Sequence, residues 1–503
     1  MVAIALGIAG AARGIHRTAE VVVGQGDDLQ AAIDAAAPGD VIRLEPGAVF
    51  TGNYVLPDHG GDDFVTIRTN APDSRLPGDD GRIDPSYARY LPTLRPAVEA
   101  PVLRTAAGAH HWRILGIRFA GTGGGNVVEL GDGSAAQRDY AEIPEQLVLD
   151  RVIVLGDAAR GQKRGVALNS GQAVVRNSYI AAIWGVGQET QAIAGWNGPG
   201  PYVIENNYLE AAGIGVLFGG AEPAIGGLVP SDITVRHNTV SRPVSWRDTE
   251  RTVKNLFELK NARRVTVTGN LFERNWSSAQ VGFAILFTVR SSGPRASWSV
   301  VEDVTFEHNV VRDVAGGINI LGYDTVGRSQ QTHGIVIRNN LFYDVDHTAW
   351  GGNGTFLQVG EAARDLTVEH NTVLQSGNLV TVYGGTRAAP RPVLGFRFTD
   401  NIGLHNTYGI FGNAVGSGTP AIAAYFPGGE IRGNVLAGGP EGKYPGGNLF
   451  PPVDELMRQF VNPAAHDYRL RPASGLLRSA TDGGRVGADI DALESVQAGL
   501  WRQ

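Results

Sequence analysis

Two closely spaced lysines are the residues of the chain that we consider first as catalytic bases. The segment KNLFELKNA contains Lys254, Glu258 and Lys260. Alternate residues of a strand point to opposite faces, so we expect these three on one outer face and Phe257 and Leu259 on the inner face. Only four lysines occur in the chain, and two of them are this pair. Arginine keeps its proton in a protein whereas lysine can act as a base, so the pair indicates proton transfer.

The charge around the two lysines indicates an anionic partner. Residues 247–295 hold nine Arg and Lys against four Asp and Glu, a local charge of +5, whereas the whole chain carries −7. A basic patch on an acidic protein favours a negatively charged ligand. Because the chain has no nucleic-acid-binding motif and is not basic overall, we expect an acidic polysaccharide and no nucleic acid. The alternative is a surface salt-bridge patch without chemistry.

The strands and loops after Lys260 supply further candidates. The strand GFAILFTVR places Arg290 outside, and long loops follow this strand and the next ones. Long loops on a rigid scaffold are a usual way to wall a binding site. We predict that the substrate is bound by Lys254, Asn319, Tyr323, Asp324, Gln358, Tyr383 and Trp350.

Two other functions fit the same region. A glycoside hydrolase needs two carboxyl groups, about 5 Å apart for retention or about 6.5 to 9.5 Å apart for inversion. Glu258 and Asp324 lie two strands apart, which at about 4.8 Å per strand approaches the inverting distance. The third hypothesis is a non-catalytic carbohydrate-binding or surface protein. Its stacking surfaces would be Trp246, Trp276, Trp298, Trp350, Tyr323 and Tyr383.

A repeated asparagine indicates the scaffold that must position these groups. The phrases ENNYLE, RHNTV, TGNLFE, EHNVVRD, RNNLFYD, EHNTVLQ, DNIGLH and RGNVLAG share Asn207, Asn238, Asn270, Asn309, Asn340, Asn371, Asn401 and Asn434. Alternating apolar residues before each asparagine predict a strand with one buried face. Repeats of about 30 residues built from short strands predict an all-β, single-stranded parallel β-helix. In this fold the asparagines would stack into a hydrogen-bonded ladder.

The two ends of the chain have their own signals. Asp28 can cap a short helix that Pro38 and Gly39 end, and this cap at about residues 27–38 would cover the open first coil. We expect a leader-like segment at 1–19, one β-helix domain over 20–503 and a closing segment at about 460–503.

The composition bears on location and partners. The start MVAIALGIAGAARG has the apolar run and small residues of a secretory leader but lacks a basic n-region. We therefore expect a protein that is secreted, periplasmic or on the cell surface. The absence of cysteine excludes disulfides and thiolate metal sites. No other apolar stretch approaches the roughly 18 residues of a membrane span, and we expect a monomer.

Three segments resemble known β-helix proteins. The stretch LQAAIDAAAPGDVIRLEPG resembles the opening of bacterial right-handed β-helix proteins of the pectate-lyase-like superfamily, and DYRLRPASGLLRSATDGGRVGADI resembles their closing segment. The run ELKNARRVTVTGNLFERN, followed by GFAILFTVR, is similar to alginate lyases and chondroitinases of polysaccharide lyase family 6. These resemblances imply a right-handed parallel β-helix with an N-terminal capping helix. They also imply a lyase that cleaves a uronate-containing glycan by β-elimination.

The lyase resemblance implies roles for individual residues. Lys260 would take the proton next to the uronate carboxylate, and Arg290 would protonate the leaving oxygen or stabilise its charge. Glu258 is the third catalytic candidate. In that family two acidic residues ahead of the lysine bind Ca²⁺, and this chain does not reproduce them, because Glu258 is too close to Lys260. Either Ca²⁺ or the surrounding arginines would neutralise the substrate carboxylate.

Overall fold

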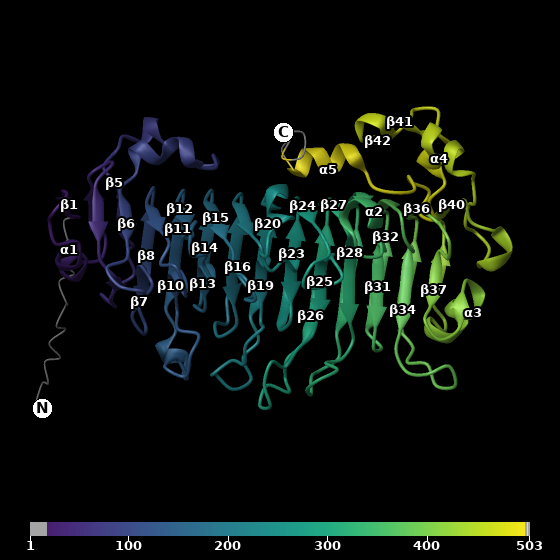
Figure 1. Ribbon diagram of the computed structural model, residues 1–503, viewed down its shortest axis with the longest axis horizontal. Coiled ribbons are helices and arrows are strands. Elements are labelled where there is room, and N and C mark those ends of the chain that lie inside the picture. Colours follow the sequence, from purple (N-terminus) through teal and green to yellow (C-terminus); the bar gives the residue numbers. More distant parts are fainter. Residues whose placement is uncertain (1–17, 498–499, 501–503) are drawn as a thin grey trace, which may run out of the picture.

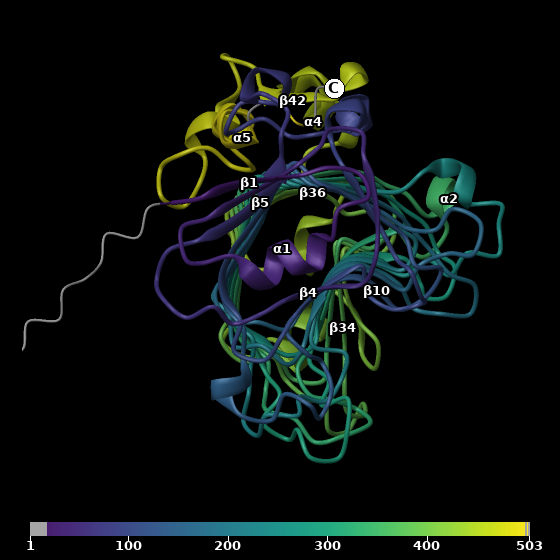
Figure 2. The same ribbon diagram turned by 90° about the vertical axis from the view of Figure 1, so that its left-hand side faces the viewer.

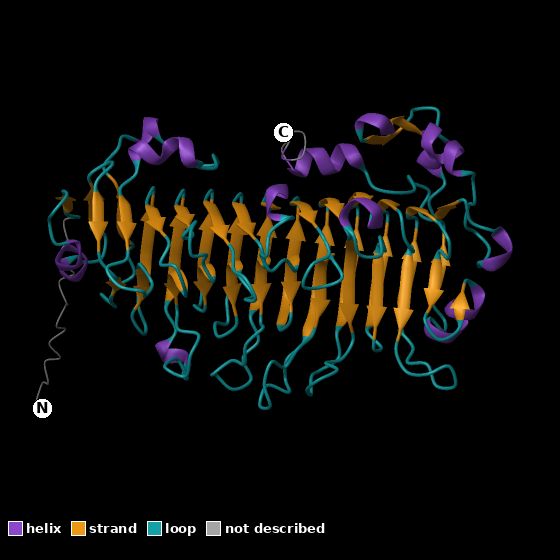
Figure 3. Ribbon diagram, viewed as in Figure 1, coloured by secondary structure: helices purple, strands orange, loops and turns teal. Residues whose placement is uncertain are grey.

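Three long parallel sheets wind around one axis. The computed structural model describes residues 18–497 and 500. The 14-stranded sheet A runs from β1 (Glu20–Val23) to β39 (Glu430–Arg432), and the 13-stranded sheet B runs from β3 (Val49–Thr51) to β40 (Val435–Ala437). The 13-stranded sheet C begins at β4 (Tyr54–Leu56) and ends with β37 (Ile410–Gly412) and the short antiparallel β38 (Gly416–Ser417). The strands stack in order along the molecule (Figure 1, Figure 3), so the predicted right-handed parallel β-helix is confirmed.

Alternating apolar side chains fill the bore between the sheets. The strands of sheet C that matter below are β19 (Ile214–Phe218), β22 (Asn255–Leu259), β25 (Phe283–Thr288), β28 (Gly316–Leu321), β31 (Leu357–Gly360) and β34 (Val380–Tyr383). Phe257 and Leu259 point into the core, as expected, and the Phe257 and Phe287 rings lie 6.4 Å apart with both side chains fully buried. Rigid packing of this kind fixes the direction of the outward residues between them.

The predicted asparagine ladder is present. In each coil the side-chain oxygen of one asparagine accepts the backbone N–H of the asparagine in the coil before, as Asn238 Oδ1 does from Asn207 N at 2.9 Å. The eight asparagines from Asn207 to Asn434 are connected in this way, and all are fully buried. Asn448, only 14 residues after Asn434, adds a further rung that the regular spacing did not predict.

Breaking the ladder at its middle should destabilise the protein. Asn270 Oδ1 accepts both the N–H and the side-chain amide of Asn238, at 2.9 and 3.0 Å. Asn270→Ala leaves these buried donors without an acceptor, which costs about 1 to 3 kcal/mol for each group. We expect a lower midpoint in thermal and urea unfolding. The exposed Asn413→Ala is the control, and an unchanged midpoint in Asn270→Ala would contradict a structural role for the ladder.

Helices close both ends of the solenoid. Helix α1 (Leu29–Ala35) begins after Asp28, whose side chain accepts the N–H of Ala31, and it buries Leu29 and Ile33. Figure 2 shows α1 across the mouth of the bore, as expected for a cap. The helix ends at Ala35, before the Pro38 predicted to end it. At the other end α3 (Thr419–Tyr425), which the repeat pattern did not predict, packs Tyr425 into the core.

The C-terminal segment folds back along sheet B. It contains α4 (Val453–Gln459), the hairpin β41 (Phe460–Asn462) and β42 (Asp467–Leu470), and α5 (Ile490–Gln497), which reaches the middle of the solenoid (Figure 1). Gln497 Nε2 donates to the carbonyl of Asn270 at 2.8 Å. The apolar residues of the C-terminal segment cover the outward side chains of sheet B at Leu271, Val310 and Leu341.

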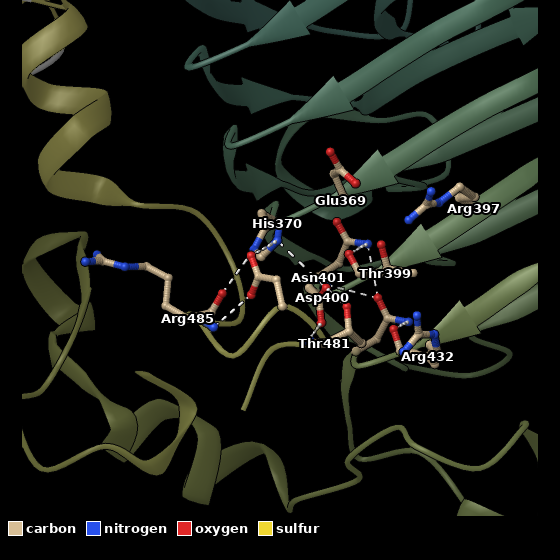
Figure 4. Close-up of polar contacts among 12 residues, drawn as sticks. Glu369, His370, Arg397, Thr399, Asp400, Asn401, Arg432, Thr481 and Arg485 are labelled. Carbon is tan, nitrogen blue, oxygen red and sulfur yellow. Dashed lines mark hydrogen bonds and ion pairs between the residues drawn. The ribbon is translucent and has the colours of Figure 1, made fainter. Parts of the chain in front are cut away.

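Polar contacts hold the C-terminal segment against residues next to the asparagine ladder. Asp400 accepts hydrogen bonds from the N–H and the hydroxyl of Thr481 at 2.8 and 2.6 Å (Figure 4). The His370 ring contacts the carbonyl of Arg485 at 3.0 Å. The segment and the long loops of the opposite side lie on different sides of the solenoid (Figure 2), so the loop side is left open.

Two expectations concern the chain outside the fold. Most of the predicted leader, residues 1–17, lies outside the described residues. Within the described part, no helix is long and apolar enough to cross a membrane.

Candidate functional site

The outer face of sheet C carries a row of aligned side chains. Parallel pairing places Glu258 of β22 beside Leu286 of β25, followed by Asn319 of β28 and Gln358 of β31. Gln358 Nε2 donates to Asn319 Oδ1 at 3.2 Å. Because the strands pair in register and alternate residues face outward, these four side chains lie on one line, and neighbouring strands are about 4.8 Å apart.

Lys260 and Arg290 lie in adjacent coils at the edge of this row. The N–H of Arg290 donates to the carbonyl of Lys260 at 2.9 Å, which fixes the two residues next to each other. Both side chains line one cavity of about 810 Å³, the sheet C cavity. Its lining comprises Glu258, Lys260, Gln280, Val281, Leu286, Thr288, Arg290, Ser291, Ser292, Gly293, Pro294, Asn319, Asp324, Val326 and Gly327.

Two lysines and two glutamates form a compact cluster at one end of the cavity. Lys254 Nζ contacts Glu189 Oε2, and Lys260 Nζ lies 3.8 Å from the same oxygen. Lys260 Nζ also lies 3.5 Å from Glu258 Oε1. Gln191 Nε2 donates to the other oxygen of Glu189 at 2.9 Å. Only 15–16% of each lysine side chain is exposed, so the ammonium groups are held in place.

The two glutamates of the cluster have opposite pKa shifts. Burial would raise the pKa of Glu189, but the charges of Lys260 and Lys254 outweigh it and hold that pKa below its usual value. Burial raises the pKa of Glu258, although Lys260 opposes the shift. Glu258 Oε2 is buried without a hydrogen-bond partner among the described residues. The cluster thus combines one carboxyl group whose pKa is lowered with one whose pKa is raised.

A carboxylate holds the side chain of Arg290. Asp324 Oδ1 lies 3.3 Å from Arg290 Nη1, and Asp324 Oδ2 accepts the N–H and the hydroxyl of Ser291 at 2.9 and 3.0 Å. Burial would raise the pKa of Asp324, but hydrogen bonds from Val326, Ser291 and Gly327 lower it below the usual value. Asp324 is therefore an ionised anchor that orients Arg290 toward the cavity.

The structure places the other predicted site residues differently. Gln358 lies in the sheet C row, whose next position is Thr381 of β34. Tyr383 pairs instead with Gly360, and its ring lies where any side chain on Gly360 would collide with it. Tyr323 lies on the far side of the loop that carries Asp324 and lines a second groove. Trp350 packs in an aromatic cluster with Trp276, Trp184 and Trp246, away from the cavity lining.

The carboxylates around Lys254 and Lys260 do not fit a Ca²⁺ site. Within residues 18–497 no group of three or more His, Asp or Glu side chains is arranged to hold a metal. The two carboxylates of the cluster that could bind Ca²⁺ already have cationic partners, because Lys254 contacts Glu189 and Lys260 contacts Glu258. Each ammonium would repel a unit positive charge about 4 Å away by roughly 4 kcal/mol at an effective dielectric constant of 20. The site therefore carries its own positive charge.

Comparison with known proteins supports the fold. No protein-family model matches the chain, and no curated protein matches it. Among solved structures, the alginate lyase AlyGC of polysaccharide lyase family 6 superposes with a TM-score of 0.57 at 14% identity, covering 94% of this chain and 58% of that enzyme. A variant of AlyGC gives 0.54 at 13% identity, with the same coverage. The chain thus spans little more than half the length of AlyGC.

A third solved structure is a mannuronic-acid-specific family 6 lyase from human gut microbiota. It superposes with a TM-score of 0.49 at 11% identity, covering 87% of this chain and 93% of that one. At 13–14% identity the likeness to AlyGC shows the fold alone.

Proposed function

We propose that the protein is a polysaccharide lyase that cleaves an acidic, uronate-containing glycan by β-elimination. The observation that carries the proposal is the meeting of Lys260 and Arg290 in one cavity, on consecutive coils of a rigid sheet. A base and a fixed cation that both reach one reacting sugar are the groups that elimination needs. The similar alginate lyases share the fold, which is compatible with this activity.

Each step of the reaction has a candidate group. Lys260 Nζ, in its neutral form, accepts the C5 proton of the uronate beside the carboxylate. The electron pair of the C–H bond forms the double bond to C4, and the bond from C4 to the glycosidic oxygen breaks. Arg290 keeps its proton, so it stabilises the negative charge on the leaving oxygen, which takes a proton from water. Lys254 offsets the charge of Glu189, so that this carboxylate does not repel the anionic substrate.

The opposite pKa shifts of Glu258 and Asp324 favour a second candidate, a glycoside hydrolase. A carboxyl group with a raised pKa and an ionised carboxylate in one cavity resemble the acid and base that hydrolysis needs. Against it, the hydrogen bonds and the ion pair of Asp324 engage both of its oxygens, and only 2% of its side chain is exposed. A carboxylate held in this way has little freedom to activate a water molecule.

A substrate screen separates the candidates. The protein is incubated with alginate, pectate, chondroitin and neutral plant glycans, and both ultraviolet absorbance of unsaturated uronate and new reducing ends are recorded. Absorbance together with reducing ends on an acidic glycan is the expected outcome. Reducing ends without absorbance would instead identify a hydrolase, and binding without either signal would leave only carbohydrate recognition.

The lysine cluster predicts that catalysis does not depend on a divalent cation. Activity on the preferred glycan and the unfolding midpoint should be unchanged when EDTA is added. Terbium luminescence, which needs no activity, should show no binding to the wild-type protein at micromolar concentrations. Lys254→Gln uncovers Glu189 and should raise terbium affinity. Loss of activity in EDTA, with recovery on adding Ca²⁺, would contradict this prediction.

A further inference from the structure

A second groove lies on sheet A beside the sheet C cavity. Four residues pair in sequence across its floor: Arg263 of β23 (Ala262–Thr268), Glu302 of β26 (Val301–Glu307), His333 of β29 (His333–Arg338) and Arg364 of β32 (Arg364–Glu369). The groove has a volume of about 480 Å³, and we call it the sheet A groove. Its two arginines are three strands apart, or about 14 Å, which suits a short run of sugar units.

The charges of the sheet A groove favour an anion. His333 Nε2 lies 3.1 Å from Glu302 Oε2 and occupies that oxygen of the carboxylate. Arg263 Nε donates to Ser231 Oγ at 2.9 Å, which holds the guanidinium in place, and its Nη atoms have no partner among the described residues. Arg364 has one ion pair, a long one of 3.6 Å to Asp365. Both arginines are thus able to bind a carboxylate or a sulfate.

Two aromatic rings border the same groove. Trp298 Nε1 donates to the carbonyl of Leu228 at 3.0 Å, which fixes the indole at the groove wall. Tyr323 also lines the groove, and 40% of it is exposed. Rings with an apolar face and a polar edge suit the alternating C–H and hydroxyl surface of a sugar.

One loop separates this groove from the sheet C cavity. Asp324, Val326 and Gly327 line the cavity, whereas Tyr323 and Gln330 of the same loop line the groove. A polymer that occupies both sites gains from the high effective concentration of its second segment, whereas a short oligomer does not. The groove is therefore placed to act on long chains.

We propose that the sheet A groove is a second, non-catalytic binding site for an acidic polysaccharide, held through Arg263 and Arg364. The identity of the glycan rests on the proposed function, whereas binding at the groove does not require catalysis. The groove would raise the affinity for polymer and leave the turnover of short oligomers unchanged.

The test compares two double variants with the wild-type protein. Arg263→Ala/Arg364→Ala removes the groove cations, and Arg236→Ala/Arg338→Ala removes the same charge from sheet A where the arginines pair with Glu205 and Glu307. Affinity electrophoresis through gels containing alginate, pectate or chondroitin measures binding. The groove variant should bind the retarding polymer at least about tenfold more weakly, as expected for the loss of charge-assisted hydrogen bonds, and the control should bind like wild type.

The turnover of short oligomers completes the test. The groove variant should cleave tetrasaccharides of the preferred glycan at the wild-type kcat and KM. Wild-type polymer binding in the groove variant, an equal loss in the control, or no retardation of the wild-type protein by any acidic polymer would overturn the inference. Slower cleavage of tetrasaccharides would show that the arginines act in the sheet C cavity instead. Retardation without cleavage of any glycan would refute the proposed lyase activity and leave the groove site standing.

Discussion

Lys260→Ala should lower kcat for eliminative cleavage by about 10² to 10⁴, the usual contribution of a positioned acid or base. The alanine variant removes the group that lines the cavity beside Glu258 and accepts the proton. The rate of unsaturated product formation, followed by ultraviolet absorbance, is the measurement. Lys443→Ala, a lysine outside the cavity lining, is the control and should keep wild-type activity.

Lys260→Arg distinguishes a base from a simple positive charge. Arginine retains the charge next to Glu189 and Glu258 but does not give up its proton. We therefore expect the arginine variant to be as inactive as the alanine variant, with an unfolding midpoint near that of wild type. Substantial activity in Lys260→Arg would show that the residue acts only through its charge.

Arg290→Ala should reduce kcat by about 10² to 10³, as for the loss of one group that stabilises developing negative charge. Asp324→Asn should have a smaller effect of the same kind, because Asp324 acts by holding Arg290 and the Ser291 backbone. If so, the double variant is no slower than Arg290→Ala alone, since the two residues act as one unit. Additive losses, or wild-type rates in Asp324→Asn, would contradict a positioning role for Asp324.

The fold could be predicted because its signal repeats. One asparagine at a fixed place in each coil, preceded by alternating apolar residues, identifies both the ladder and the direction of every strand. The same periodicity places Glu258, Asn319 and Gln358 on one face, and the register bears this out. Such inferences succeed where a side chain lies inside a regular strand.

Residues in loops could not be placed in this way. Glu189 contacts Lys254 across 65 residues of sequence, from the loop between β15 (Tyr179–Ile183) and β16 (Gln191–Gly195). Loop backbones do not follow a period of two, so no pattern predicted this partner. Because they also lie in a loop, the adjacent residues Tyr323 and Asp324 line different sites. Asp324 lines the sheet C cavity, and Tyr323 lines the sheet A groove.

The sequence contains a sign of the returning C-terminal segment that the alternation of apolar residues did not reveal. Two apolar residues follow several of the ladder asparagines, as in Leu271-Phe272 and Leu341-Phe342. One residue of each pair faces the bore, and the other is buried beneath the segment that contains α5. Consecutive apolar residues in a strand indicate that both faces are covered, here by chain more than 100 residues away.

The origin of the oxygen in the products tests elimination at this site. The preferred acidic glycan is cleaved in water enriched in heavy oxygen, and the products are weighed by mass spectrometry. Elimination breaks the chain without adding water, so the fragments should sum to the mass of the intact glycan and carry a double bond. Products analysed before the new reducing end exchanges its oxygen with water should contain no heavy oxygen. Fragments heavier by one water molecule, with heavy oxygen incorporated at the cleaved bond, would contradict the lyase mechanism.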